Sequence, residues 1–163
     1  KTSPVFKNLK EYFVTKEKNM IAILMGSKSD LPVVEKAIEI LKAFEVKYEV
    51  RVLSAHRTPE QTKEYIKIAE AEGVKVASYT TRPVIGIPIK TSDLGGMDSL
   101  LSIVQMPSGI PVATVAINGS ANAALLAIQM MALSDPELAQ KMNQYRIEQA
   151  EKVMDDNLEI DNL

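Results

Sequence analysis

Apolar residues follow two kinds of pattern in the first third of the chain. The run Met20–Met25 (MIAILM) is apolar throughout, as in strands that are buried on both faces. From Val33 to Phe44 the apolar residues recur at intervals of three and four, which is typical of a helix with one buried face. In Val46–Val52 every second residue is apolar, as in a strand. The order strand, helix, strand predicts a parallel βαβ unit.

Sequence signals at both ends predict a second helix. Thr58 has the character of an N-cap, Pro59 suits the first helical position, and Gln61 completes a capping box with Thr58. The helical pattern runs to about Glu72, and Gly73 is expected to end it.

The remaining two thirds of the chain continue the alternation of strands and helices. Strands are predicted at residues 74–76, 84–89 and 112–117, and helices at 98–105, 121–133 and from Asp135-Pro136 to about residue 155. The helix at 121–133 is apolar nearly all round, which favours a buried position or a subunit interface. The whole pattern predicts an α/β fold with a parallel, doubly wound sheet and a long C-terminal helix.

One connection is too short for this pattern. Only seven residues, Ala77–Pro83, separate the strand that ends at Val76 from the strand that begins at Val84. A parallel crossover needs about a dozen residues or more. Either the two strands form an antiparallel hairpin, or sequence is missing at this point.

Composition narrows the class of protein. A chain of 163 residues is expected to form one domain, which we place at residues 20–163, with the lysine-rich residues 1–19 as an extension outside it. The net charge of −2 disfavours a dedicated nucleic-acid binder. The absence of Cys excludes disulfides and thiol nucleophiles, and a single His excludes a multi-histidine metal site. No apolar run is long enough to span a membrane.

Two polar turns are the candidate binding sites. Gly26–Asp30 and Ser54–Arg57 each follow a predicted strand and precede a predicted helix. In open α/β sheets, ligands bind beyond the carboxyl ends of the strands. The N–H groups and the dipole of a helix N-terminus attract phosphate, so both turns suit a phosphorylated ligand.

The side chains of these turns fit the same ligand. Ser27 and Ser29 offer hydroxyl donors, Asp30 can accept from a sugar hydroxyl, and the Arg57 guanidinium matches phosphate oxygens. The simpler interpretation is that Ser29 and Asp30 cap the helix that follows, with Pro32 in its first turn. One residue can do both, so the two interpretations stay open.

His56 is the only histidine of the chain and lies in the second turn. An unperturbed imidazole titrates near pH 6.5, so it can both give and take a proton at neutral pH. A loop histidine without a catalytic role is the plainer alternative. The position beside Arg57, at the end of a strand, favours the catalytic role.

Four motifs occur in order along the chain: MGSKSD (Met25–Asp30), SAHRTP (Ser54–Pro59), DSLLSIVQMPSGIPVATVAI (Asp98–Ile117) and NAALLA (Asn122–Ala127). Together they resemble one enzyme family, class I N5-carboxyaminoimidazole ribonucleotide mutase of de novo purine biosynthesis. The resemblance covers about residues 20–155, and the four motifs together are far more specific than any one alone.

The resemblance implies a flavodoxin-like three-layer α/β sandwich, a homo-octamer and a cytoplasmic enzyme that uses neither metal nor organic cofactor. It implies that the substrate is a small ribonucleotide, and that nucleic acid and membrane are not partners. His56 is expected to be the general acid–base. The residues expected to bind the substrate are Ser27, Ser29, Asp30, Ser54, Arg57, Met106 and Pro107.

The chain departs from this family at one place. Members carry a glycine-rich loop with a second histidine after the third strand, whereas here Val76 passes directly to Ala77. About fifteen residues are absent, at the junction that is also too short for a crossover. Three explanations stay open: the residues belong to the protein but are missing from this sequence, they were deleted deliberately, or the natural protein lacks them. We favour the first.

Two other functions stay open. A class II member of the same family would carboxylate aminoimidazole ribonucleotide directly with carbon dioxide. A non-catalytic module on the same fold would bind a phosphoribosyl group or flavin mononucleotide without using His56 as an acid or base.

Overall fold

The computed structural model describes residues 20–54, 56–71 and 82–161. The chain forms two compact units, residues 1–124 and residues 125–163, and each is described by itself. The predicted strand at 74–76 and the junction between Val76 and Ala77 lie outside the described residues, as does the predicted extension at 1–19.

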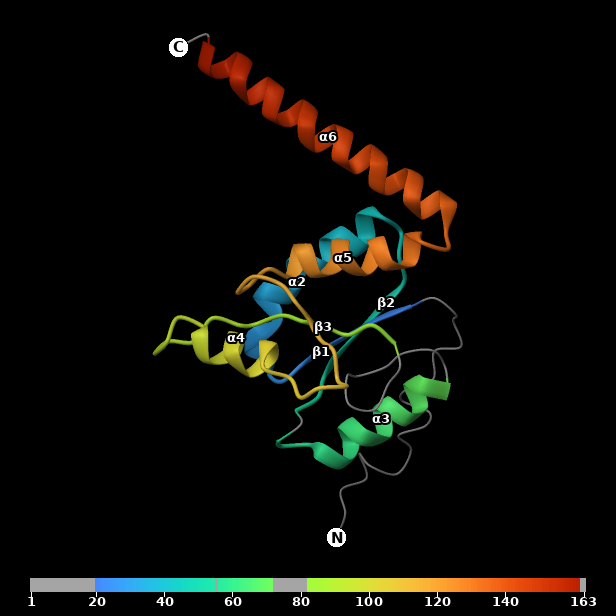
Figure 1. Cartoon of the computed structure of the whole chain (residues 1–163), viewed down its shortest axis with the longest axis vertical. Helices are drawn as coiled ribbons and strands as arrows, with labels where there is room; N and C mark the ends of the chain where they lie inside the picture. The colour runs from blue at the N-terminus through green and yellow to red at the C-terminus, as the bar shows by residue number, and fades with distance from the viewer. Residues whose placement is uncertain (1–19, 55, 72–81, 162–163) are drawn as a thin grey trace. The chain divides into compact units, whose positions relative to one another are not determined.

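The first unit begins with the predicted βαβ arrangement (Figure 1). Strand β1 (Ile21–Met25) pairs in parallel with β2 (Tyr48–Val52) along all five residues of each strand. The connection consists of a short 3-10 helix, η2 (Lys28–Asp30), and the helix α2 (Leu31–Ala43). The parallel pairing confirms the α/β class predicted from the hydrophobic pattern.

Helix α2 buries the face that its spacing predicts. Val34, Ala37, Leu41 and Phe44 are buried, and they recur at intervals of three and four. Such a stripe lies on one side of a helix, so its burial fixes how the helix is rotated about its own axis.

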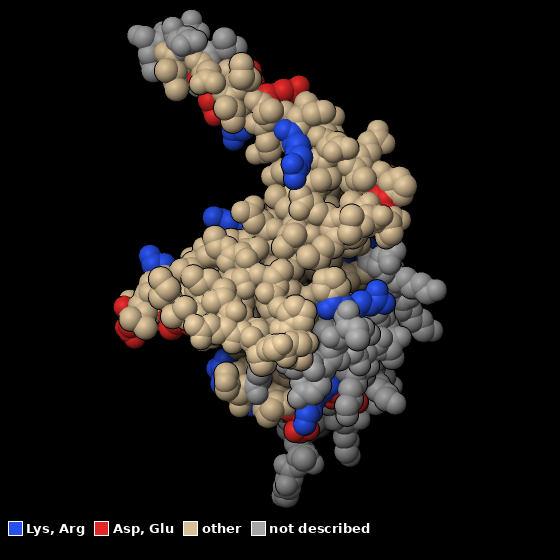
Figure 2. All heavy atoms as spheres, viewed as in Figure 1, with Lys and Arg blue, Asp and Glu red and all other residues tan. Residues whose placement is uncertain are grey.

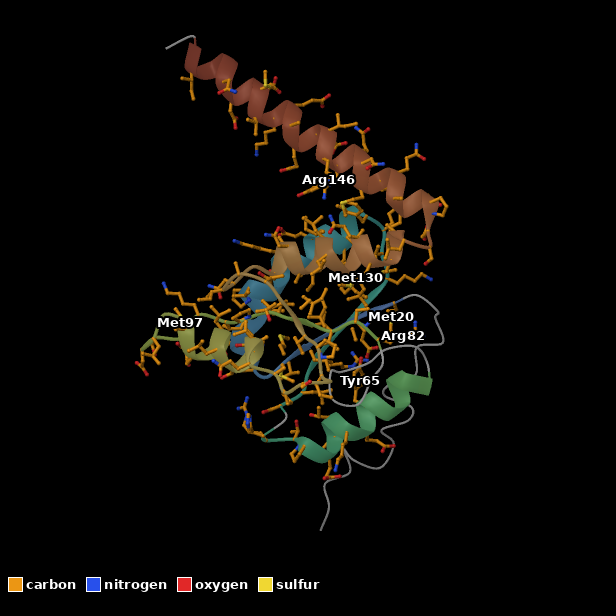
Figure 3. The ribbon with its side chains drawn as sticks, in the orientation of Figure 1. Met20, Tyr65, Arg82, Met97, Met130 and Arg146 are labelled. Atoms are coloured by element: carbon orange, nitrogen blue, oxygen red, sulfur yellow. The ribbon has the colours of Figure 1, made fainter. Side chains whose placement is uncertain are left out.

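Helix α3 (Pro59–Ala71) lies on the opposite side of the β1–β2 pair from α2 (Figure 1). Its Tyr65 is 1% exposed and extends toward the strands (Figure 3). The ring packs against four partly buried apolar residues, which are Met20, Ala22, Leu24 and Leu53. Because alternate residues of a strand face opposite sides, Ala22 and Leu24 present one face of β1 to α3.

The next two strands are much shorter than predicted. Strands β3 (Ile85–Gly86) and β4 (Ala113–Thr114) pair in parallel, whereas the hydrophobic runs predicted strands at 84–89 and 112–117. Proline supplies the physical reason, because it has no N–H to donate to a ladder. Pro88 lies within the predicted strand 84–89 and cannot donate to β4, so the predicted lengths were wrong while the order and direction of the strands were right.

Helix α4 (Met97–Val104) confirms the helix predicted at 98–105. It packs so closely on β3 that a Cβ on Gly86 would collide with the side chain of Ile103. Gly96 precedes α4 with φ 95°, and a Cβ there would lie 2.8 Å from a methyl carbon of Ile117. Glycine is required at both positions, by space at the first and by backbone conformation at the second.

The last two helices are α5 (Ser120–Ala132) and α6 (Pro136–Asp161). The 26 residues of α6 confirm the predicted long C-terminal helix, which extends past the predicted end near residue 155. Ile128 of α5 is fully buried, while Leu133, just after it, is 89% exposed. No described helix is both long enough and apolar enough to cross a membrane.

Candidate functional site

The two polar turns lie side by side at one edge of the β1–β2 pair. The parallel strands are in register, so their carboxyl ends coincide. The Leu53 N–H donates to the Met25 carbonyl at 2.9 Å, which continues the pairing to the beginning of both turns. Sequence reasoning placed the turns at this edge, and the register brings them together.

The first turn is held by a reciprocal set of hydrogen bonds. The Ser27 N–H donates to Asp30 Oδ2 at 3.0 Å, and the Ser27 hydroxyl accepts from the Ser29 N–H at 3.3 Å. The Ser29 hydroxyl donates to Ser27 Oγ at 2.8 Å. These bonds make a capping box around η2, with Ser27 at the N-cap and Asp30 at the third position, rather than the predicted cap of the following helix by Ser29 and Asp30. Ser29 stays exposed beside them and can meet a ligand.

Asp30 also occupies the N-cap position of α2, as predicted, but its carboxylate makes no cap bond to that helix. The carboxylate is directed to Ser27 instead, because the 3-10 turn places that N–H within reach. The same acidic side chain therefore shapes the turn that precedes the helix.

The second turn is closed by Ser54 and Thr58. The Thr58 hydroxyl donates to the Ser54 carbonyl at 3.0 Å and accepts from the Ser54 N–H at 2.9 Å. The Ser54 hydroxyl accepts from the Arg57 N–H at 3.2 Å. Thr58 therefore stabilises the turn and does not form the predicted capping box with Gln61. Its hydroxyl makes both of its hydrogen bonds to the Ser54 backbone.

Arg57 joins the two turns. Its Nη2 donates to the Gly26 carbonyl at 2.6 Å, across 31 positions of sequence. This bond uses one of the five N–H donors of a guanidinium and brings a permanent positive charge to the first turn. A cation beside two serine hydroxyls and a helix N-terminus is an arrangement that can hold a phosphate group.

His56 lies in the second turn, between the residues that close it, and is exposed. Met106 and Pro107 lie elsewhere, in the loop between α4 and β4. There the Pro107 carbonyl accepts from the Ile110 N–H at 3.1 Å. Among the described residues, no hydrogen bond joins Met106 or Pro107 to either turn.

A charged cluster beneath the sheet was missed by the sequence reasoning. Glu49 of β2 is only 8% exposed, and its carboxylate pairs with Arg51 two positions along the strand. Both face α3, where the Glu49 carboxylate lies close to the Tyr65 hydroxyl. Burial raises the pKa of Tyr65 well above its ordinary value, and the negative charge of Glu49 raises it further. Charged residues of a strand with alternating polarity usually face water, whereas Glu49 and Arg51 face α3.

The charge distribution gives no support to a polyanion-binding surface on the face that Figure 2 shows. Lys and Arg side chains are interspersed with Asp and Glu side chains there, without a large area of one sign. Within residues 20–54, 56–71 and 82–161, no group of three His, Cys, Asp or Glu side chains could hold a metal ion. The local positive charge at the two turns comes from Lys28, Arg57 and the N-terminal ends of the helices.

Curated relatives match most of the chain. It is 50% identical over 152 positions to the N5-carboxyaminoimidazole ribonucleotide mutase of Pyrococcus horikoshii, with 84% of this chain and 86% of the relative covered. The mutase of Thermotoga maritima is 47% identical over 150 positions, with 83% and 88% covered. A phosphoribosylaminoimidazole carboxylase of Candida glabrata is 42% identical, but the match covers only 30% of that longer protein.

Solved structures and a family comparison agree with these relatives. The crystal structure of Treponema denticola PurE superposes with a TM-score of 0.79 at 30% identity, covering 87% of this chain and 98% of that one. A second crystal structure, of a variant of the Treponema denticola protein, gives a TM-score of 0.80. The family described as AIR carboxylase matches two segments, residues 20–77 and residues 75–152. The parallel α/β fold, the relatives and this match lead to one conclusion: the chain belongs to the AIR carboxylase family.

Proposed function

We propose that this protein is an N5-carboxyaminoimidazole ribonucleotide mutase, an isomerase of purine biosynthesis. It moves the carboxyl group from the exocyclic nitrogen of the imidazole to ring carbon 4. The observation that carries the proposal is the identity of about half of all aligned positions to curated mutases across most of both chains. The joining of the two turns through Arg57 agrees with it.

In this proposal the two turns and a third loop bind the substrate. Arg57, Ser27, Ser29 and Asp30 hold the ribose phosphate end. Ser54 lines the same pocket from the second turn, and the loop of Met106 and Pro107 contributes to it as the family resemblance implies. The hydrogen bonds that close the turns support the binding role, because a turn held in shape loses little conformational entropy when a ligand binds.

His56 acts as the general acid and base. Loss of carbon dioxide from the exocyclic nitrogen breaks the N–C bond and requires a proton on that nitrogen. Attack of the electron-rich ring carbon on carbon dioxide then forms the C–C bond, and the ring carbon loses its proton to restore aromaticity. One imidazole can give the first proton and take the last, so the proton balance closes on a single residue.

The reaction needs a closed pocket, because free carbon dioxide must not escape before it is captured. We therefore propose that the functional protein carries about fifteen further residues between Val76 and Ala77, forming the glycine-rich loop of the family. The family match divides into two segments that meet at residues 75–77. The 152 aligned positions with the Pyrococcus horikoshii mutase cover 84% of the 163 residues, about 137, which leaves about 15 positions without a counterpart.

Intact mass of the purified protein tests this loop directly. A mass above that of the printed sequence by about fifteen residues, with peptides that map between Val76 and Ala77, is the expected result. Synthesis of the chain as printed gives the complementary test. We expect it to bind ribonucleotide but to show little or no turnover, because the substrate stays uncovered. Full activity of the printed chain would contradict the need for the loop.

A class II carboxylase is the second candidate. The curated relatives that match across most of both chains are named as mutases, which favours the mutase. Assays of N5-carboxyaminoimidazole ribonucleotide and of aminoimidazole ribonucleotide, each without added bicarbonate, separate the two activities. The mutase is expected to convert only the first substrate. The non-catalytic binding module predicts that neither is converted and that replacing His56 changes nothing.

The assembly and setting of the enzyme are proposed with the function. We propose a cytoplasmic homo-octamer with one domain over residues 20–163, an extension at 1–19, and neither metal nor organic cofactor. The family resemblance supports the octamer, and so do the exposed apolar side chains on α4 and α6, such as Leu101 and Met154. Sedimentation of the purified protein at several concentrations tests it, and a stable monomer would contradict it.

A further inference from the structure

A hydrogen bond links the start of α5 to the start of α2. The hydroxyl of Ser120, the first residue of α5, donates to the backbone carbonyl of Val33. Ser120 is 0% exposed and Val33 is half-buried, so this bond is only partly accessible to water. The two residues are 87 positions apart in sequence, and both belong to the first unit.

Val33 lies three residues after Asp30, in the first turn of α2. The carbonyl that Ser120 reaches is therefore within one helical turn of the capping box formed by Ser27 and Asp30. A helix is stiff over so short a distance, so a contact that fixes its first turn also fixes the polar turn before it.

Ser120 is itself held in place by the turn that precedes it. Asn118 has φ 59°, in the left-handed region that asparagine tolerates better than most residues. Its N–H donates to the Pro88 carbonyl at 2.8 Å, and its side-chain oxygen accepts from the Lys90 N–H at 2.9 Å. The Ser120 N–H then donates to the Asn118 carbonyl at 3.0 Å. The segment after β3 thus anchors the turn that presents the Ser120 hydroxyl.

We propose that Ser120 is a positioning residue for the phosphate-binding turn of this enzyme, acting through Val33. Asn118 supports it by holding the turn in which Ser120 lies. This proposal rests on the proposed function, in which turn 26–30 binds the phosphate group of the ribonucleotide. Ser120 touches no substrate, and its effect on the reaction passes through the geometry of Ser27, Ser29 and Asp30.

The size of the expected effect follows from the chemistry. In Ser120→Ala the Val33 carbonyl keeps the bond that every helical carbonyl makes to the residue four positions on. Only the added bond is lost, and one neutral hydrogen bond is worth roughly threefold to tenfold in an equilibrium constant. We expect this loss in phosphate affinity and in KM, with kcat at saturation changed less and its pH profile unmoved.

The chain offers a matched control. The Ser102 hydroxyl also donates to a backbone carbonyl, that of Asp98 at 2.8 Å, but it is exposed on α4. Ser102→Ala removes the same kind of bond from an exposed position, where donor and acceptor both belong to α4. It is expected to leave ribose 5-phosphate affinity and KM at the wild-type values.

The experiment is a titration of wild type, Ser120→Ala and Ser102→Ala with ribose 5-phosphate in a calorimeter, together with thermal unfolding of each. A threefold to tenfold weaker affinity in Ser120→Ala alone supports the proposal. Equal affinity in all three, with a lower Tm for Ser120→Ala, would overturn it, because the bond would then serve stability only. No binding by the wild type would instead overturn the proposed function, and the positioning role with it.

A second variant covers the case in which Ser120→Ala does not fold. Asn118→Gly keeps the left-handed backbone conformation and removes only the acceptor for the Lys90 N–H. The Asn118 turn is then less firmly held, and ribose 5-phosphate affinity should fall by a smaller factor than in Ser120→Ala, roughly twofold to threefold. Wild-type affinity in a folded Asn118→Gly protein would count against the chain of contacts from β3 to α2.

Discussion

Two turns of similar composition serve opposite purposes in this molecule. Turn 26–30 (GSKSD) and turn 118–120 (NGS) both contain Gly and Ser, come after a parallel strand and lead into a helix. In the first, Ser29 is exposed and the hydroxyls can meet a ligand. In the second, Ser120 is completely buried, and its hydroxyl bonds to another helix. The polar composition of a turn therefore indicates that it connects a strand to a helix, but it does not indicate whether its side chains are exposed or buried.

The difference arises from what surrounds each turn. Turn 26–30 follows β1, whose only hydrogen-bonded neighbour among the described strands is β2, and the neighbouring turn supplies Arg57 rather than a covering element. Turn 118–120 is hydrogen-bonded to the segment 88–90. The Pro88 carbonyl accepts from the Asn118 N–H, and the Lys90 N–H donates to the Asn118 side chain. Variants in the first turn and its neighbour should cost function with little loss of stability, and variants in the second should cost stability as well.

The largest effect is expected from His56→Asn. Loss of the proton carrier should lower turnover of N5-carboxyaminoimidazole ribonucleotide by about 10²–10⁴. Because His56 is exposed, Tm and ribose 5-phosphate affinity should stay close to the wild-type values. Steady-state kinetics and calorimetry measure the two quantities separately. Turnover within twofold of wild type would favour the non-catalytic binding module.

A smaller effect is expected from Arg57→Lys. Lysine keeps the charge but loses the planar fork and the bond to the Gly26 carbonyl. Affinity for ribose 5-phosphate should fall roughly tenfold to a hundredfold, the range for a hydrogen bond to a charged group. Arg146→Lys, at an exposed position on α6, is the matched control and should bind as wild type does. Equal binding by both variants would remove Arg57 from the proposed site.

Asn118→Ala should mainly lower stability. Alanine at φ 59° costs about 1–2 kcal/mol in backbone energy, and the bond to the Lys90 N–H is lost as well. Denaturant unfolding is expected to give a free energy of unfolding lower than wild type by about 1–3 kcal/mol. Asn118→Gly should recover the backbone part of this loss. A stability equal to wild type in Asn118→Ala would contradict the described turn.

Tyr65→Phe should give the smallest change at neutral pH, about 1 kcal/mol, because it removes only a buried hydroxyl that lies beside Glu49. The pKa of Tyr65 is raised in the folded protein by burial and by Glu49, so its contribution to stability is complete below its unfolded pKa near 10. That contribution is lost as pH rises above 10, because the unfolded chain releases the proton first.

Thermal unfolding of wild type and Tyr65→Phe between pH 8 and pH 11 tests this dependence. The difference in stability should narrow above pH 10, and the titration of groups common to both proteins cancels in the difference. If the difference in stability between the two proteins stays constant or widens over this range, folding does not raise the pKa of Tyr65.

Much of the fold and part of the site could be predicted from the sequence. The spacing of Val34, Ala37 and Leu41 predicted the buried face of α2 because helical periodicity is a local property. The positions of both polar turns followed from strand ends in the same way. The lengths of β3 and β4 were overestimated, because the apolar pattern was weighed above the missing N–H group of Pro88. The place of Met106 and Pro107 in the site rests on resemblance alone.

Sequence by itself determined the α/β class, the order of the elements, the two turns with their candidate side chains, and the AIR carboxylase resemblance. These depend on periodicity, turn residues and motif spacing, which are local properties of the sequence. Three features were decided only by the tertiary structure. Arg57 bonds to the Gly26 carbonyl, and the Ser120 hydroxyl bonds to the first turn of α2. The ion pair of Glu49 and Arg51 is covered by α3. Each of these joins residues from different elements, and their burial depends on how whole strands and helices pack, which no local pattern encodes.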